Sequence, residues 1–491
     1  MGNPGRTAGT TRQPPRAPRE RVSIELPSTA PRPGPLDPHV RARARDHALR
    51  ARRRTRRRRF VDVALAFACL GFGATLALAV TSESLGSLRA AGGVDTAIGR
   101  VAGLAGAYLL LLLVLLMARL PALERAAGQD RLAHWHRRLG PWPIVLIALH
   151  ATFITFGYAE AARTGFWHQL GTFLGHYPDV LGATVAFALL VLVGLVSAGI
   201  ARRRLRYETW WTIHLYVYLA LALAFAHQIV TGAPFVAHPL TLALWSAVWA
   251  TTAGTVLVFR VLLPLSRSLR HGLRVVSVRD AAPGVVSILL KGRRLDRLAV
   301  EGGQFFQWRF LQRGLWWQAH PYSLSALPSP PYLRLTIRSS GDHGRSLARL
   351  QPGTRVAIEG PYGAFTASRR HSDGVLLVGA GVGVTPLRAM LEALPPHVDA
   401  TVIVRASNRE ALVLHDELAE LVRARAGALH EVVGTRDSVH LDARLLLRLV
   451  PDVAARDVYV CGPEGFAEKL VATARRLGVR PERIHREAFS F

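Results

Sequence analysis

Cysteine and lysine are the residues that this 491-residue chain most nearly lacks. Its two cysteines, Cys69 and Cys461, lie far apart in the sequence, which excludes a disulfide-stapled scaffold. Among the 62 basic residues only Lys291 and Lys469 are lysines, and 33 acidic residues leave a formal net charge of +29. Half of the residues are hydrophobic, which excludes a wholly disordered protein. At roughly 100–200 residues per domain, the length predicts two to four domains.

Residues 1–59 are dominated by arginine and proline, with 17 arginines and only four acidic residues. Because this composition cannot form a packed core, it predicts a disordered basic tail. The tail ends in an arginine block, residues 52–59, directly before an apolar run. Such a block is typical of nucleic-acid binding, or of a segment that sets membrane orientation and binds anionic lipid. Its position beside an apolar run favours the membrane interpretation, so we expect lipid contacts and no nucleic-acid partner.

Six apolar stretches follow, each near the ~20 residues that cross a bilayer as a helix. They occupy about residues 60–81, 98–118, 139–158, 180–200, 210–230 and 240–263. Arginines cluster before the first stretch, between the second and third, between the fourth and fifth, and after the sixth, whereas the other three loops hold only Arg89 and Arg163. By the positive-inside rule this predicts a six-helix bundle over residues 60–265 in the cell membrane, with both termini in the cytoplasm.

The sequence pattern changes after the sixth apolar stretch. Short strand-like runs separated by Gly- and Pro-bearing turns predict an antiparallel β-barrel over residues 270–368. From residue 374 the order becomes strand, glycine loop, helix and strand, which predicts an α/β domain with a parallel sheet over residues 372–491. The chain is therefore expected to be a multi-domain membrane protein: a six-helix transmembrane bundle, an antiparallel β-barrel and an α/β nucleotide-binding domain.

Four histidines lie within or at the edge of the apolar stretches, where ionisable groups are costly and often functional. The third stretch carries His136 and His150, and the fifth carries His214 and His227. Neutral imidazole is an axial ligand of haem iron, so two such helices could hold two haems. On an ideal helix the first spacing rises about 21 Å with both rings on one side, whereas the second rises about 20 Å but turns its rings about 140° apart. Hydrogen bonding between helices is the alternative explanation, and His134 is an alternative to His136.

A possible flavin segment stands between predicted barrel strands. His320, Pro321, Tyr322 and Ser323 place an aromatic ring and then a hydroxyl on an extended segment, which is suited to stacking on a flavin and hydrogen bonding to its N5. Tyr322 as an ordinary core residue is the alternative. Farther on, Arg338 precedes the glycine-bearing segment 341–346, and a guanidinium beside exposed backbone amides suits a pyrophosphate.

A glycine loop, from Gly379 to Pro386, follows a predicted strand and opens a predicted helix. In this context a loop holds phosphates at a helix N-terminus, although the spacing here is not the Rossmann GxGxxG. After the next strand, Arg405, Ser407 and Arg409 are candidates for binding a ribose 2′-phosphate. A solvated arginine-rich surface is the alternative for these three residues.

Two further features lie near the carboxyl terminus. Cys461, Gly462 and Pro463 follow another predicted strand, and the alternative for Cys461 is a small buried hydrophobe. An aromatic residue, Phe491, ends the chain, although chain ends are usually polar and frayed. If Phe491 covers a flavin, it has to move before nicotinamide can stack there, which is a gating role. Packing against the barrel is the alternative for Phe491.

The histidine pattern resembles the ferric reductase and NADPH oxidase superfamily of transmembrane flavocytochromes. The segment 136–140 (HRRLG) followed by His150 is similar to the third-helix signature of that family, and His214 with His227 is similar to its fifth-helix pair. In that family these histidines bind two b-type haems. The resemblance therefore implies that His136 and His214 bind the inner haem, and that His150 and His227 bind the outer haem.

The soluble half resembles the ferredoxin-reductase-type FAD and NAD(P) module of the same superfamily, with Tyr322 at a position that is usually phenylalanine. The FAD-binding residues that this resemblance implies are His320, Pro321, Tyr322, Ser323, Arg338 and Ser346. The implied NAD(P)H-binding residues are Gly379, Gly381, Gly383, Thr385, Pro386, Arg405, Gly462 and Pro463. The resemblance also implies that Cys461 sets the nicotinamide and that Phe491 stacks on the flavin. The segment 341–346 departs from the usual family form around His343.

Together these features predict an NAD(P)H-dependent oxidoreductase, with NADPH favoured. Electrons would pass from cytosolic NAD(P)H through FAD and two haems b to an extracytoplasmic acceptor, either ferric iron or oxygen. Two alternatives remain. One is a membrane-anchored haem and flavin redox sensor, and the other is a reductase dedicated to a separate extracytoplasmic protein.

Overall fold

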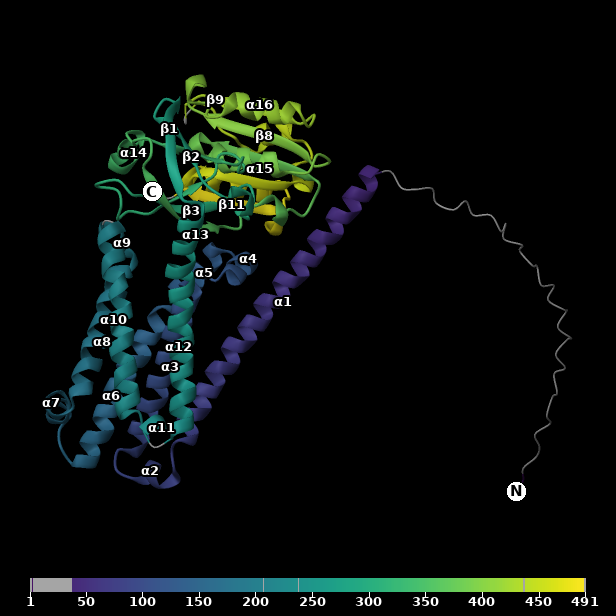
Figure 1. Cartoon of the computed structure of the whole chain (residues 1–491). Helices are drawn as coiled ribbons and strands as arrows, with labels where there is room; N and C mark the ends of the chain where they lie inside the picture. The colour runs from purple at the N-terminus through teal and green to yellow at the C-terminus, as the bar shows by residue number, and fades with distance from the viewer. Residues whose placement is uncertain (1, 3–37, 206, 237, 436–437, 490–491) are drawn as a thin grey trace. The chain divides into compact units, whose positions relative to one another are not determined.

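The computed structural model describes residue 2 and residues 38–205, 207–236, 238–435 and 438–489 (Figure 1). Its contacts divide it into a first unit, Met1–Asp46, and a second unit, His47–Phe491. Most of the predicted tail lies outside the described residues, but its end is helical, because α1 runs from Pro38 to Thr81. The expectation that residues 38–59 are disordered is therefore wrong. Ala and Arg are strong helix formers, and no glycine or proline interrupts the chain between Pro38 and the first apolar stretch.

Two arginines near the start of α1 bind the nucleotide-type domain. The buried guanidinium of Arg50 donates to Asp373 at 2.7 Å and to the carbonyl oxygen of Ser372 at 3.2 Å. Arg54 donates to the carbonyl oxygen of Arg370 at 2.7 Å. Part of the arginine block therefore has partners within the chain itself.

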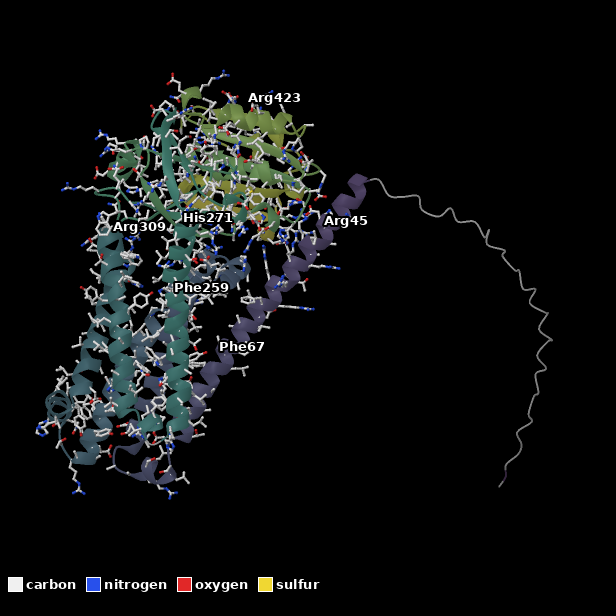
Figure 2. All side chains as sticks on the ribbon, in the orientation of Figure 1. Arg45, Phe67, Phe259, His271, Arg309 and Arg423 are labelled. Carbon is white, nitrogen blue, oxygen red and sulfur yellow. The ribbon has the colours of Figure 1, made fainter. Side chains whose placement is uncertain are left out.

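Six helical segments of the described chain are long and apolar enough to cross a membrane, as predicted. They are Arg45–Thr81, Gly93–Met117, Arg131–Ala162, Asp179–Ser197, Thr209–Thr231 and Pro239–His271. Many apolar side chains on these helices are exposed, among them Phe67 at 71% (Figure 2). Exposed apolar surface of this extent is typical of helices that contact lipid tails.

The bundle is built from long helices joined by short ones. The helices that form the spans after α1 are α3 (Gly93–Met117), α5 (Gln129–Leu139), α6 (Pro141–Ala162), α8 (Pro178–Ser197), α10 (Tyr207–Thr231) and α12 (Pro239–Leu257), with α5 and α6 sharing the third span. The short helices are α2 (Leu85–Arg89), α4 (Pro121–Ala127), α7 (Phe166–His176), α9 (Gly199–Arg204) and α11 (Ala233–Val236). α3 packs along α6, and α8 packs along α10. The third span is divided at Gly140 because Pro141 and Pro143 lack the N–H groups that continue a helix.

The last span changes its winding before it ends. α12 passes into a π-helical turn, Val258–Leu262, and then into α13 (Leu263–His271). Pro264 follows this turn, and in a regular α-helix its ring would clash with the carbonyl group of Arg260. The wider π-helical turn accommodates the proline without ending the helix.

Residues 273–362 form an antiparallel barrel-like sheet. Its strands are β1 (Leu273–Ala282), β2 (Val285–Lys291), β3 (Phe305–Phe310), β4 (His320–Ser323), β5 (Tyr332–Arg338) and β6 (Arg355–Tyr362), in the order β4-β3-β6-β1-β2-β5. A bridge between Leu324 and Leu335 joins the two ends of this order. Alternate residues point inward, so that Phe306, Trp308 and Phe310 of β3 are buried in one core. One helix, α14 (Gly341–Ala348), lies between β5 and β6 in the sequence.

Strand β6 contacts the end of the last span. The hydroxyl of Ser268 on α13 accepts a hydrogen bond from the backbone N–H of Ile358 at 2.9 Å. Arg260 and Glu359 form an ion pair at 2.7 Å. These contacts attach the barrel directly to the membrane helix that precedes it in the chain.

The last domain is a parallel five-stranded sheet. Its strands are β7 (Gly374–Ala380), β8 (Asp399–Ala406), β9 (Ala428–Val433), β10 (Asp457–Pro463) and β11 (Ile484–Phe489), in the order β11-β10-β7-β8-β9. Its helices are α15 (Val384–Ala393), α16 (His415–Arg423), α17 (Ala443–Leu449) and α18 (Glu464–Arg476). Both faces of the sheet are buried, which explains the continuous apolar runs of its strands. The strand order reverses between β7 and β10, and sheets of this kind bind ligands at the carboxyl ends of the strands beside such a reversal.

Candidate functional sites

The structure brings the four membrane histidines together as two facing pairs. His136 on α5 lies opposite His214 on α10, with ring centroids 6.1 Å apart. His150 on α6 lies opposite His227 on α10, with ring centroids 6.4 Å apart. These are the two pairs that the family resemblance implies. His134, the alternative to His136, is exposed.

The distance within each pair fits a metal ion bound between the two imidazoles. Metal–nitrogen bonds to histidine are about 2.0–2.1 Å long, and two of them in line place the ring centroids roughly 6.3 Å apart. Close packing supports the second pair, because a Cβ atom at Gly103 would lie 2.6 Å from His150 Nδ1. Only glycine at position 103 leaves this space for the imidazole.

The same ring nitrogen, Nδ1, has a polar neighbour in all four histidines. The neighbours are Leu113 O for His136 (3.2 Å), Gly99 O for His150 (2.8 Å), Ser197 Oγ for His214 (3.4 Å), and Asp179 Oδ2 (3.0 Å) and Thr231 Oγ1 (3.1 Å) for His227. A hydrogen bond from Nδ1 sets the tautomer that leaves Nε2 available to a metal. Each pair therefore offers two imidazole nitrogens that could hold a metal ion.

The predicted flavin segment forms strand β4, which pairs with β3. His320 and Tyr322 project from the same face of β4, with ring centroids 6.3 Å apart and 20° between the ring planes. Burial raises the pKa of Tyr322, so its phenol stays protonated. The buried Oγ of Ser323 has no hydrogen-bond partner among the described residues. An unsatisfied buried hydroxyl costs roughly 1–3 kcal/mol, so Ser323 fits a site where a bound flavin supplies the partner.

The predicted pyrophosphate residues lie at the end of β5 and in α14. Arg338 is exposed at the end of β5, and Gly341, with a left-handed φ of 74°, begins α14. The side chain of Ser340 does not cap this helix, so its first N–H groups are open to an anion. The hydroxyl of Ser346 donates to the carbonyl oxygen of Asp342 at 2.9 Å. Because a hydroxyl has a single hydrogen, Ser346 in this state cannot also donate to a phosphate.

The glycine loop lies where the strand order of the parallel sheet reverses. Gly381 and Gly383 follow the end of β7 in a short 3-10 turn, and α15 begins at Val384. A Cβ atom at Gly383 would lie 2.3 Å from the backbone oxygen of Cys461 at the end of β10. The loop and the 461–463 segment are therefore in contact, as a shared nucleotide site requires. Thr385 is buried, and its hydroxyl donates to the carbonyl oxygen of Val382.

Cys461 is fully buried, in one apolar cluster with Tyr459, Val384 and Leu387. Burial raises the pKa of Cys461 well above the ordinary value of a thiol. The side chain is therefore a neutral thiol rather than a reactive thiolate. Its position fits a packing role better than that of a nucleophile.

Arg405 was expected to contact a ribose 2′-phosphate, but its guanidinium binds backbone instead. It donates to the carbonyl oxygens of Gly434 and Thr435 at 2.8 Å each, and to that of Ala406. A guanidinium used in this way holds the ends of β8 and β9 together. Arg409 is exposed and keeps its guanidinium at the surface.

Two other predicted features remain without a structural test. Phe491 lies outside the described residues. Gly462 and Pro463 end β10 beside β11, and Gly379 and Pro386 flank the loop described above. Their roles toward NAD(P)H stay predictions from the resemblance.

The sequence motifs did not indicate the contact between the barrel and the parallel-sheet domain. Arg334 of β5 forms a bidentate ion pair with Glu417 of α16: its two terminal nitrogens donate to Oε1 at 2.6 Å and to Oε2 at 2.7 Å. Arg388 of α15 binds the same carboxylate at 2.8 Å. Burial alone would raise the pKa of Glu417, but the hydrogen bonds and charges of Arg334 and Arg388 outweigh it and lower that pKa. This ion pair fixes the two nucleotide-type sites relative to each other.

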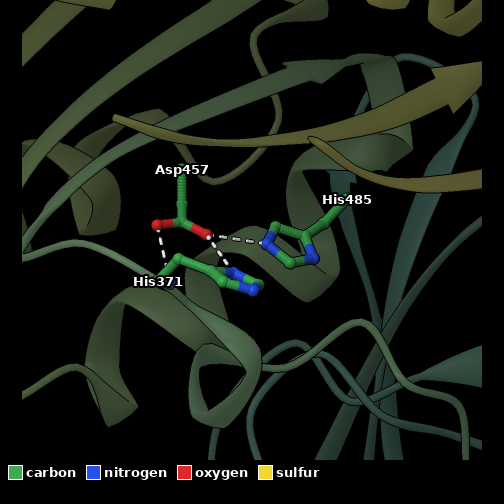
Figure 3. A group of neighbouring side chains, drawn as sticks. All are labelled: His371, Asp457 and His485. Carbon is green, nitrogen blue, oxygen red and sulfur yellow. Dashed lines mark hydrogen bonds and ion pairs between the residues drawn. The ribbon is translucent and has the colours of Figure 1, made fainter. Parts of the chain in front are cut away.

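A second cluster missed at the sequence level surrounds Asp457, which is fully buried at the start of β10. Its Oδ2 accepts hydrogen bonds from the backbone N–H groups of His371 (2.7 Å) and Ser372 (2.6 Å) and from the Ser372 hydroxyl (2.8 Å). Its Oδ1 lies 2.9 Å from His485 Nε2 and 3.3 Å from His371 Nδ1 (Figure 3). This network ties the loop before β7 and the last strand, β11, to β10.

The three side chains of this cluster are also a possible set of metal ligands. However, both oxygens of Asp457 already accept hydrogen bonds. Burial and then the positive charge of Arg54 lower the pKa of His371. Because the carboxylate oxygens are already engaged, we interpret the cluster as a structural hydrogen-bond network.

Comparison with protein families agrees with this arrangement of domains. Residues 102–225 match the ferric reductase like transmembrane component family, residues 284–366 match an FAD-binding domain, and residues 377–471 match an oxidoreductase NAD-binding domain. This order of domains is that of a flavocytochrome of the ferric reductase and NADPH oxidase type, with a ferredoxin-reductase-type module. The soluble half therefore contains an FAD-binding and an NAD-binding domain.

Individual relatives match the soluble half. A flavohemoprotein of Bacillus subtilis is 30% identical over 188 residues, which cover 34% of this chain and 46% of that protein. An NADPH oxidoreductase of Mycobacterium tuberculosis is 27% identical over 228 residues, which cover 44% of this chain and 59% of that protein. A solved flavohem-like FAD/NAD binding domain of a nitric oxide dioxygenase from Vibrio cholerae has a TM-score of 0.39 and 25% identity, and the match covers 45% of this chain and 99% of that one. The chain spans about half the length of the curated relatives that it matches.

Proposed function

We propose that this protein carries electrons from NAD(P)H, through FAD and two b-type haems, to an acceptor on the other side of a membrane. One observation carries the proposal: four membrane histidines form two facing pairs, and each ring has Nδ1 engaged by a neighbour. Three of the four lie within residues 102–225, which match a ferric reductase like transmembrane component, and His227 lies two residues beyond that match. FAD-binding and NAD-binding domains follow in the same chain.

Each group of residues has a part in this pathway. The glycine loop 379–386 would hold the NAD(P)H diphosphate, and the segment 461–463 would limit where the nicotinamide lies. Tyr322 and Ser323 would position the flavin ring. FAD, when bound, accepts a hydride and can release electrons one at a time, which nicotinamide does not do readily. The Arg334–Glu417 ion pair would keep the donor and acceptor sites aligned during the transfer.

The histidine pairs would each hold one haem, which supplies one-electron transfer when bound. The imidazoles of His136 and His214 would ligate the inner haem, and those of His150 and His227 the outer haem. Helical rise separates the two pairs by about 20 Å, a large part of the ~30 Å hydrocarbon layer. The residues of the bundle would hold the rings in place and exclude water around them.

We place both termini in the cytoplasm of a cell whose plasma membrane holds the bundle, because the arginine clusters flank the corresponding helix ends. On the opposite side, the acceptor would be ferric iron or oxygen. A hollow lined by Glu83, Thr96, Arg100 and Tyr158 supports this side as the exit. Its Arg100 directly follows Gly99, whose carbonyl oxygen binds His150.

We further propose that NADPH is preferred to NADH. Arg405 no longer supports this preference, because it binds backbone carbonyl groups. Arg409 is the remaining candidate for the 2′-phosphate, since it is exposed after the end of β8.

Anaerobic stopped-flow spectroscopy of the full-length protein in lipid nanodiscs, loaded with FAD and haem, tests this function. Mixing with NADPH should first bleach the flavin and then reduce the haems, faster than with NADH. Ferric citrate or oxygen should then reoxidise the haems and allow steady turnover. Flavin reduction without haem reduction would refute the proposed route. Haem reduction without turnover would favour a sensor, and reoxidation only by an added extracytoplasmic protein would favour a dedicated reductase.

Replacing Cys461 by alanine should slow hydride transfer roughly tenfold, about 1.4 kcal/mol in barrier, while the FAD content stays normal. The buried thiol packs at the end of β10 against the glycine loop, so its loss should loosen the nicotinamide site alone. Transient kinetics of flavin reduction measure the rate, and absorbance measures the bound flavin. Cys69→Ala is the matched control, because Cys69 is exposed on α1. Loss of FAD from Cys461→Ala would show that the thiol belongs to the flavin site instead.

A further inference from the structure

His343 is half-buried, and its two ring nitrogens are buried without a hydrogen-bond partner in the part of the chain that the structure describes. It lies in the first turn of α14, three residues after Ser340, which precedes the helix. Neither Nδ1 nor Nε2 has a partner among the described residues, and both atoms are shielded from water. A neutral imidazole always carries one donor and one acceptor. Leaving both unsatisfied is costly, and a native structure that does so calls for an explanation.

The surroundings of His343 are those of the expected flavin-nucleotide site. Its ring stacks on His320 of β4, with centroids 3.7 Å apart and 29° between the ring planes. The ring of His320 is also stacked with that of Tyr322, with centroids 6.3 Å apart. Arg338 and the uncapped start of α14 lie in the segment directly before His343. The imidazole thus contacts the predicted flavin segment and belongs to the helix that follows the predicted diphosphate residue Arg338.

The charged and titratable groups nearby leave His343 as a neutral donor. Burial, with a smaller contribution from His320, lowers the pKa of His343 to about 4. Asp342 and Arg345 of the same helix are exposed and bind each other at 2.6 Å. At neutral pH the His343 ring therefore offers one N–H group rather than a positive charge.

Rotation of the His343 ring about χ2 would change the direction of this N–H group. The residue as a whole is partly exposed, although its two nitrogens are not. A half-turn about χ2 exchanges Nδ1 with Cδ2 and Nε2 with Cε1, and the χ2 torsion of histidine is broad and roughly two-fold. The stacking on His320 is preserved by such a turn.

We propose that His343 binds the diphosphate of FAD, as the hydrogen-bond donor that Ser346 does not supply. The Ser346 hydroxyl already donates to the Asp342 carbonyl oxygen, whereas His343 has a donor with no partner. The departure of segment 341–346 from the usual family form then has a function: the phosphate contact moves from Ser346 to an imidazole. This inference rests on the proposed function, because it requires that the chain bind FAD.

Two variants of the full-length protein separate binding from packing. His343→Phe keeps an aromatic ring to stack on His320 but has no N–H group, and His343→Gln keeps a donor without the ring. A hydrogen bond to a charged phosphate predicts that His343→Phe weakens FAD binding roughly ten- to hundredfold. His343→Gln should recover a large part of this affinity. Quenching of flavin fluorescence on titration of the flavin-free protein measures both dissociation constants.

Riboflavin, which has no phosphate, is the matched ligand. His343→Phe should bind riboflavin as the natural protein does, since the ring-stacking residues are intact. Equal loss of FAD and riboflavin affinity, or unchanged FAD affinity, would overturn the assignment of His343. Failure of the natural protein itself to bind FAD would refute the proposed function, which is a different and separately visible result.

Discussion

Protein with His227 replaced by alanine should contain one haem, whereas the natural protein should contain two. His227 faces His150 at 6.4 Å, and removing either imidazole leaves the other ring without the second axial ligand. The remaining pair, His136 and His214, should keep its haem. The pyridine haemochrome assay, performed on protein produced with ample haem supply, gives the ratio of haem to protein. Electron transfer to an outside acceptor should fall to the background rate, while NADPH still reduces the flavin.

Two further variants sharpen this prediction. Asp179→Asn should weaken haem retention at the outer pair by roughly 10- to 100-fold, because Asp179 orients His227 through Nδ1. His168→Ala is the control, since His168 is exposed and has no part in either pair. If the natural protein holds a single haem or none, the two-haem proposal is wrong.

Asp457→Asn should destabilise the parallel-sheet domain by about 3–5 kcal/mol, as expected when one partner of a buried charged network is removed. The carboxylate accepts hydrogen bonds from the backbone of His371 and Ser372 and from the His485 ring. An amide nitrogen at this position would oppose donors instead of accepting from them. Differential scanning calorimetry of the full-length protein in detergent measures the loss. Asp452→Asn is the control, because Asp452 is half-exposed and its ion pair with Arg456 should contribute at most about 1 kcal/mol.

The Asp457 carboxylate should also make the stability of the folded protein depend on pH. Burial alone would raise the pKa of Asp457, but hydrogen bonds from His485, Ser372 and His371 outweigh it and lower that pKa. A lowered pKa in the folded state stabilises the fold above the pKa of the unfolded carboxyl, about 3.9, and this stabilisation is lost as pH falls through the folded value. The acid-induced loss of stability below about pH 4 should therefore be smaller in Asp457→Asn. If stability below about pH 4 falls equally in Asp457→Asn and in the natural protein, Asp457 does not cause the acid-induced loss.

Local sequence patterns predicted the membrane spans and the order of the domains because those features depend on neighbouring residues. A run of apolar residues or a glycine loop between strand and helix is visible without the rest of the chain. The ideal-helix estimate nevertheless placed His214 and His227 about 140° apart, whereas the structure directs both toward partners. The observed ring directions depend on helix packing and side-chain torsions, which residue spacing along the sequence does not describe.

Residues whose roles depend on distant partners could not be identified in this way. Asp457 is an isolated acid in the sequence, and its donors come from residues 371, 372 and 485. Arg405 had the right spacing for a phosphate contact, but the carbonyl oxygens at the end of β9 lie within its reach. Residues 38–59 are helical despite their high net charge, because alanine and arginine favour a helix and no glycine or proline follows Pro38 in this segment.

The π-helical turn at Val258–Leu262 determines the helical phase at which α13 leaves the membrane span. Each residue of a helix adds about 100° of rotation and about 1.5 Å of rise, so the wider turn offsets α13 from the direction that an unbroken α12 would give it. The directions in which Ser268 and Arg260 reach β6 depend on this wider turn. The direction in which the last span continues toward the barrel therefore depends on the five residues Val258–Leu262, and one of them, Arg260, also forms an ion pair with the barrel.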